Sequence, residues 1–126
     1  MTRPAPADDR PHVGVDGKAT AAGAGGRVVG PDWMETWGFD FYDANLDVAG
    51  WIQFIHHPAS QRAAYASACI GPDRRLVVVV DPAIKIPVLK PSLEFRAEGI
   101  WAQHVCETPL EHWSVGLEAF GVALED

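Results

Sequence analysis

Apolar and polar residues alternate with a repeat of two through most of this chain, from Trp33 to Leu124. In the segment E-T-W-G-F-D-F-Y-D, residues 35–43, the side chains of Trp37, Phe39 and Phe41 fall on one side of an extended chain. Successive side chains of a β-strand point to opposite faces, so the pattern predicts strands rather than helices. Any fold for this chain must therefore be built mainly from β-sheet.

The alternation predicts about seven strands, separated by turn sequences every 8–12 residues or so. Residues 48–56 are apolar on both sides, which favours a central position in a sheet. Residues 62–70 are rich in alanine, so a helix is the alternative to a strand there. Three prolines in residues 82–92 indicate an edge segment or a loop. The expected strands cover residues 35–43, 48–56, 62–70, 76–80, 93–97, 100–107 and 112–123.

This spacing is typical of an all-β antiparallel meander that curls into a sandwich or a barrel. Seven strands are fewer than the eight or more that an up-and-down barrel usually needs. An incomplete barrel is therefore expected, with an open edge that a second copy or another polypeptide covers.

The chain divides into a tail, residues 1–31, and a β-domain, residues 32–126. Sixteen of the first 31 residues are Ala, Gly or Pro, and none is aromatic. Such a composition cannot bury enough apolar surface to order the chain, so a flexible, disordered tail is expected.

Composition excludes several classes of partner. The net charge of −7 argues against nucleic acid, because neutralising phosphates requires clustered Lys and Arg. No apolar run reaches the roughly 18 residues of a membrane-spanning helix, and no signal peptide is recognisable. Two cysteines are too few for a disulfide framework, which favours reduced thiols and a cytoplasmic location.

Titratable side chains gather around the T-P-L-E connection. A carboxylate there could hold an imidazole in one tautomer, which is an arrangement suited to acid–base chemistry. Solvated loop residues are the plainer interpretation. The candidate catalytic residues are Glu107, Glu111 and His112.

The aromatic side chains suit either a hydrophobic ligand pocket or an ordinary core. A pocket would also need a few polar groups at defined places. The candidate ligand-binding residues are Trp37, Phe39, Asp40, Trp51, Arg96, Trp101, His104 and Trp113, and Gln53 and Gln103 are further polar candidates.

A metal site is a weaker alternative. His104 and Cys106 share one side of a strand, and the string G-x4-H-x-C-x4-E-x4-G loosely resembles the cupin motif. Cysteine replaces the second histidine of that motif, and both glycine spacings are one residue short. Ordinary hairpin residues explain the string better, and neither a metal nor an organic cofactor is expected.

Two strings carry a more extensive resemblance: W-G-F-D-F-Y-D-A-N-L-D-V-A-G-W at 37–51 and R-A-E-G-I-W-A-Q-H-V-C-E-T-P-L-E-H-W-S-V-G-L-E-A-F at 96–120. They resemble a set of uncharacterised bacterial proteins related to the lipocalin-like AttH and hydroxyneurosporene synthase superfamily. The likeness covers most of residues 33–126. Members of the set run past the point where this chain ends, so the chain resembles their N-terminal half.

The resemblance implies a calycin-like barrel with a hydrophobic cavity and no cofactor. It also implies a terpenoid or polyketide-like ligand, on which some members act as hydratases, cyclases or isomerases. Whether this chain catalyses a reaction is left open by its residues. The alternative from another class is a non-catalytic module that pairs, as a homodimer or with a partner β-domain, through an exposed strand edge.

Overall fold

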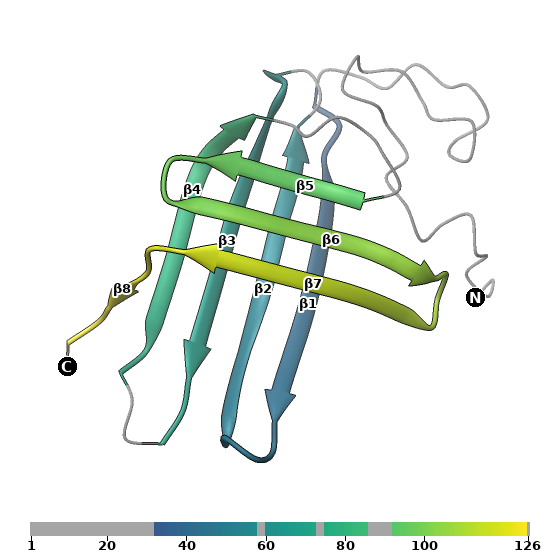
Figure 1. Ribbon diagram of the computed structural model, residues 1–126. Coiled ribbons are helices and arrows are strands. Elements are labelled where there is room, and N and C mark those ends of the chain that lie inside the picture. The colour runs from purple at the N-terminus through teal and green to yellow at the C-terminus, as the bar shows by residue number, and fades with distance from the viewer. Residues whose placement is uncertain (1–31, 58–59, 73–74, 86–91, 126) are drawn as a thin grey trace.

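The computed structural model of the 126-residue chain describes residues 32–57, 60–72, 75–85 and 92–125. The predicted tail and the prolines at positions 87 and 91 lie outside these ranges. The described residues form eight strands in two sheets (Figure 1), and they contain no helix long and apolar enough to cross a membrane. The strands are β1 (Glu35–Asp43), β2 (Val48–His57), β3 (Arg62–Ile70), β4 (Val77–Lys85), β5 (Ser92–Ala97), β6 (Ile100–Thr108), β7 (His112–Ala119) and β8 (Val122–Ala123).

All neighbouring strands are antiparallel, and most follow one another directly along the chain. The larger sheet has the order β1-β2-β3-β4-β8, and the smaller sheet has the order β5-β6-β7. The prediction of an all-β antiparallel meander is confirmed, and β2 lies inside its sheet as its two apolar faces indicate. Over the described residues the two sheets do not close into a barrel.

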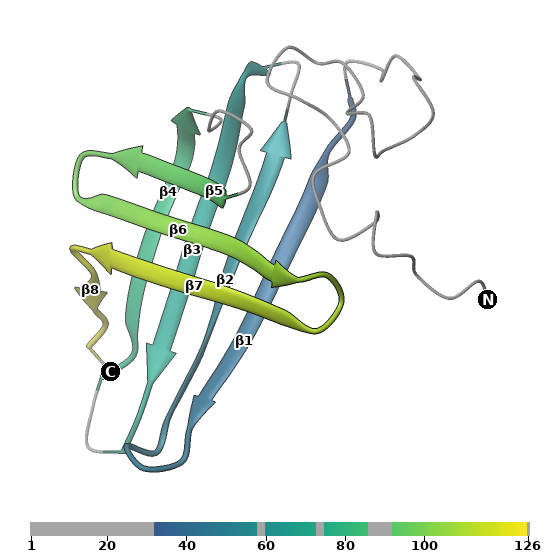
Figure 2. The same cartoon turned by 45° about the vertical axis from the view of Figure 1, so that its right-hand side comes forward.

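The smaller sheet lies across one face of the larger one, and its strands cross the direction of β1 to β4 at a large angle (Figures 1 and 2). At one side the chain passes from β7 in the smaller sheet to β8, which pairs with β4 of the larger sheet. Main-chain hydrogen bonds fix this crossing: Phe120 N donates to Gly99 O at 3.0 Å, and Leu124 N donates to Leu76 O at 2.9 Å. At the opposite side, the β6–β7 hairpin extends beyond β1.

Two strands differ from the sequence prediction by more than one residue at a boundary. Strand β4 continues through Asp81 and Pro82, where an end was expected. Proline is tolerated there because β8 pairs only with Val77 and Val78, which leaves the rest of that edge without a partner strand among the described residues. The strand expected over residues 112–123 is divided at residues 120–121, where the chain leaves one sheet for the other.

The alanine-rich segment, residues 62–70, is strand β3 and not a helix. Strand β3 lies between β2 and β4, and its side chains Ala63 and Tyr65 belong to the core, so tertiary packing outweighs the helix propensity of alanine. The turn before β2 forms as its Asp and Asn content indicates: the main-chain N–H groups of Asn45 and Leu46 donate to Asp43 Oδ1 at 2.8 and 3.1 Å.

The core lies where the two sheets cross. Phe54 on β2 has no exposed surface, and its ring lies 4.8 Å from that of Phe95 on β5 and 6.3 Å from that of Tyr65 on β3, centroid to centroid. The remaining buried apolar side chains of this cluster are Ile52, Ala63, Ile84, Leu93 and Ala102. Aromatic rings of both sheets meet at the centre of this core, so ring packing contributes to how the sheets meet.

Candidate functional site

Half of the predicted ligand-binding residues come together between the sheets. The ring of Trp113 on β7 lies 5.4 Å from the rings of both Trp37 and Phe39 on β1, and Phe39 lies 5.3 Å from the ring of His104 on β6. Trp37, Phe39 and Trp113 are half-buried, whereas His104 has no exposed surface. We call these four residues the inter-sheet cluster.

Strand parity explains why these residues meet. Trp37 and Phe39 are two apart on β1 and share the face turned toward the smaller sheet. In the smaller sheet, Trp113 is paired with Cys106, and Cys106 lies two residues from His104 on the same face of β6. Side chains from both sheets are thus directed into one space, beside the edge strand β1.

His104 is the polar member of this cluster. Its Nε2 lies 3.4 Å from the hydroxyl oxygen of Tyr65, and its Nδ1 has no hydrogen-bond partner among the described residues. Burial lowers the pKa of His104 to about 4, and a weaker hydrogen-bond contact with the main chain of Leu93 opposes this shift. A neutral imidazole therefore stands against the cluster, and its Nδ1 is a donor or an acceptor according to its tautomer.

A second buried histidine was missed from the sequence. His56 on β2 is 1% exposed, its ring lies 5.4 Å from Phe54 and 6.0 Å from Phe95, and no described residue bonds its Nε2. Burial lowers the pKa of His56 to about 4. The sequence interpretation ended a strand at this residue and gave it no role at a site, although its spacing of two from Phe54 placed both on one face.

Tyr65 was expected in a strand but not at a site. Its side chain is fully buried, lies 5.1 Å from the ring of Phe95, and brings its hydroxyl to His104. Burial raises the pKa of Tyr65 well above its ordinary value, so this hydroxyl keeps its proton.

The other four predicted ligand-binding residues lie on the outer faces of the sheets. Asp40 and Trp51 are cross-strand neighbours on the larger sheet, turned away from the smaller one. Arg96 and Trp101 are cross-strand neighbours on the smaller sheet, and Arg96 Nε donates to the Glu94 carboxylate. Their strand parity is opposite to that of the inter-sheet cluster, as is that of the polar candidates Gln53 and Gln103.

The three predicted catalytic residues occupy the exposed β6–β7 hairpin. Glu107, Glu111 and His112 all face solvent, and Glu111 N donates to Thr108 O at 3.0 Å across the turn. His112 is paired with Thr108, four residues from His104, which is roughly 13 Å along a strand. These groups therefore lie beside the inter-sheet cluster rather than within it, and their catalytic role stays a prediction.

The pairing of β6 with β7 also bears on the alternative prediction of a metal site at His104 and Cys106. His104 is paired with Val115, so neither Glu111 nor His112 comes back across the hairpin to it. No group of three or more His, Cys, Asp or Glu side chains converges as a metal site in the part of the chain that the structure describes.

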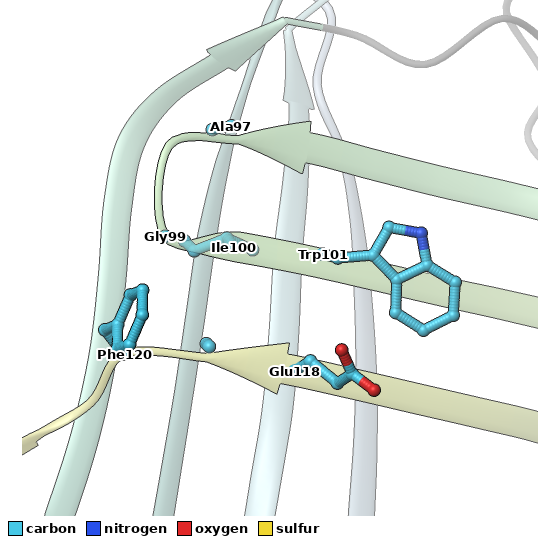
Figure 3. A pocket seen from close by; sticks show the side chains of 7 residues that line it. Ala97, Gly99, Ile100, Trp101, Glu118 and Phe120 are labelled. Carbon is cyan, nitrogen blue, oxygen red and sulfur yellow. The ribbon is translucent and has the colours of Figure 1, made fainter.

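Two surface depressions lie away from the inter-sheet cluster. One, of about 460 Å³, is on the smaller sheet near the β5–β6 turn, where Trp101 and Glu118 project from paired positions and Phe120 lies beyond the end of β7 (Figure 3). The other, of about 260 Å³, is lined by Trp51, Ala68 and neighbouring residues of the larger sheet.

Comparison with known proteins gives a family and no named relative. No curated protein and no solved structure matches the chain. Residues 27–125, which include all described strands, match DUF7064, a domain of unknown function. The chain therefore belongs to the DUF7064 family.

Proposed function

We propose that this domain binds an apolar small molecule carrying one hydroxyl or carbonyl group, and that the molecule docks at the inter-sheet cluster. The observation that supports this most directly is the buried Nδ1 of His104, a polar atom that makes no hydrogen bond of full geometry to any described residue. Leaving such an atom unsatisfied costs about 1–3 kcal/mol, and such groups call for a functional explanation.

The surroundings of His104 suit a largely apolar ligand. Phe39 packs against the imidazole, and Trp37 and Trp113 stand half-buried next to it at the edge of the larger sheet. Half-buried rings can turn outward to admit a ligand at less cost than fully buried ones, because part of their surface already meets water. A ligand inserted there would replace ring–ring contacts with its own apolar body and would bring its polar group to Nδ1.

The resemblance of residues 37–51 and 96–120 supports a more specific form of this proposal. We place the DUF7064 domain within the lipocalin-like AttH and hydroxyneurosporene synthase superfamily and propose a terpenoid or polyketide-like ligand. The two crossed antiparallel sheets are compatible with part of a calycin-like barrel. If the domain is catalytic, proton transfer on the bound ligand is the expected chemistry, with Glu107 or Glu111 as acid or base and His112 as its partner.

The test uses a matched pair of ligands, a sesquiterpene alcohol such as farnesol and the hydrocarbon farnesene. Binding is followed by quenching of tryptophan fluorescence on the full chain. The alcohol is expected to bind about tenfold more tightly, because one hydrogen bond is worth about 1.4 kcal/mol. In His104→Phe this preference should disappear while the hydrocarbon still binds.

His57→Phe is the matched control, because it removes a histidine that bonds Ser60 away from the inter-sheet cluster. This variant should keep the wild-type preference for the alcohol. Absence of saturable binding by either ligand would refute the proposal. An unchanged preference for the alcohol in His104→Phe would show that His104 does not bind the polar group of the ligand.

Pairing through a strand edge is a second candidate function. Strand β1 is nine residues long, forms one edge of the larger sheet, and contains neither proline nor lysine to discourage pairing. If copies of the chain associate through this edge, Asp40→Pro should abolish self-association; if they do not, association should be unchanged. Size-exclusion chromatography with light scattering measures the oligomeric state.

A further inference from the structure

The outer face of the larger sheet, turned away from the smaller sheet, is mostly apolar across its central strands, with the uncharged polar residue Gln53 in their middle. We call it the outer sheet face; its apolar side chains include Trp51, Ile55, Ala66, Ala68, Ile70 and Val80. Trp51 is 41% exposed, Ile70 is 53% exposed and Val80 is 67% exposed. Singly exposed apolar residues are ordinary, but a largely apolar face on three adjacent strands, β2 to β4, marks an interaction site.

This face has a ridge and a groove next to each other. Small side chains on β3, Ala66 and Ala68 among them, form a low column between Trp51 on β2 and Val80 on β4. The depression of about 260 Å³ lined by Trp51, Ala68 and Ile70 lies at one end of this column. A bulky knob therefore stands directly beside a hollow of small residues on one surface.

Charged side chains are confined to the margins of the face. Among the described residues, Asp40 lies on the edge strand β1, and Arg62 and Lys85 are paired at one end of β3 and β4. Arg62 donates to the main-chain oxygen of Ala83 at 3.1 Å. The middle of the face has no charge that would need solvent or a partner of opposite sign, so an apolar partner surface can cover it without burying an ion.

The size of the face meets the requirement of a stable dimer. Strands of nine or ten residues, at about 3.3 Å per residue and about 4.8 Å between strands, give four strands a flat area of roughly 570 Å². Two copies would bury roughly 1,100 Å², which exceeds the approximately 1,000 Å² expected of a biological interface.

We propose that a second copy of this chain covers the outer sheet face, as a two-fold dimer in which Trp51 of each copy lies in the alanine column of the other. A two-fold axis brings the same patch of each copy together, so a surface that carries both knob and hollow is complementary to itself. Residues 1–31 fit the column less well, because they contain no aromatic side chain to fill it. This interface is a sheet face, distinct from pairing through the edge of β1 and independent of ligand binding between the sheets.

Sedimentation velocity of the full chain at rising concentration tests the proposal. The wild type should reach a dimer within the micromolar range. Trp51→Lys and Ala66→Lys should each weaken dimerisation by about 30-fold or more, the loss expected for a buried interface anchor. Gln103→Lys is the matched control, because it adds the same charge in the middle of a strand but on the smaller sheet.

Circular dichroism identifies the variants that retain the fold. The measurement on the wild type tests the proposal even if a variant does not fold. A wild type that is monomeric at every concentration overturns the proposal, and the face would then be covered by residues 1–31 or by another protein. A dimer that survives both outer-face variants also overturns it, as does equal weakening by all three lysine variants.

Discussion

The two faces of the larger sheet are built by the same strands and have opposite characters. The inner face buries large rings, among them Tyr65, together with His56, and it packs against His104 of the smaller sheet. The outer face combines small and β-branched side chains with the exposed Trp51. Strand β2 makes the contrast clearest, since Phe54 and Trp51 lie three residues apart and face opposite ways. We therefore propose ligand binding at the inner face, which holds the buried polar groups, and association through the outer one.

The largest expected difference between the faces is in their contribution to stability. Phe54→Ala should lower the free energy of unfolding by about 3–5 kcal/mol, because it removes a fully buried ring from the centre of the aromatic core. Trp51→Ala should cost less than half of that. Urea unfolding at concentrations where the chain is monomeric measures both, and equal losses would contradict the contrast.

Acid should weaken the inner face through its two histidines. Burial lowers the pKa of His56 and of His104 from 6.5 to about 4, so the unfolded chain binds more protons than the folded one between these values. The free energy of unfolding is then highest above pH 6.5. It decreases as the pH falls toward 4, by an amount on the order of 3 kcal/mol per histidine.

Urea unfolding at several pH values between 7.5 and 5 measures this loss. His104→Phe should remove about half of the pH dependence in that range. The exposed His112 is the control, and His112→Gln should leave the dependence as it is. A wild type whose stability does not change over this range would show that the two imidazoles are not held neutral by burial.

Two glycines give a matched comparison of the faces by steric fit. A Cβ at Gly50 would lie 2.3 Å from the main-chain oxygen of Ala68 and 2.4 Å from the ring of Phe41, so Gly50→Ala should cost about 1–3 kcal/mol. At Gly38, on the outer face, nothing lies within 4 Å of the added atom. Gly38→Ala should be neutral or stabilise by about 0.5–1 kcal/mol, as melting temperatures would show.

The hydroxyl of Tyr65 should matter less than the rings around it. Tyr65→Phe keeps the ring and removes the partner of His104 Nε2, so a loss of about 1 kcal/mol is expected. Unfolding measurements give the loss, and the NMR signals of the His104 ring should shift in the same variant. An unaltered imidazole spectrum would mean that this contact, at 3.4 Å, carries no hydrogen bond in solution.

The smallest effect is expected at the β6–β7 hairpin. The combined variant Glu107→Gln, Glu111→Gln and His112→Ala changes only exposed groups and should alter stability by no more than about 0.5 kcal/mol. Ligand affinity at the inter-sheet cluster should also stay unchanged, as fluorescence titration would show. Any turnover that is later found should fall in this variant if the acid–base assignment is right.

Much of the fold could be predicted from local patterns, because strand parity is a short-range property. The alternation of Trp37, Phe39 and Phe41 places them on one face before any partner is known, and the Asp43 turn follows from side chains that bond their own backbone. The grouping of the candidate site residues could not be predicted, since parity assigns a residue to a face without saying which face meets the other sheet. Asp40, Trp51, Arg96 and Trp101 were chosen for their chemistry and lie on the opposite faces from His104.

By itself, the sequence determined that this chain forms antiparallel strands with defined faces, because a repeat of two can bury its apolar residues only in a sheet. The tertiary structure alone decided that the sheets cross without closing over the described residues, that β7 passes into β8 beside β4, and that His56 and His104 are buried among rings. These features depend on which distant surfaces pack together. The free energy of that packing is a sum over contacts between remote segments, which no local pattern contains.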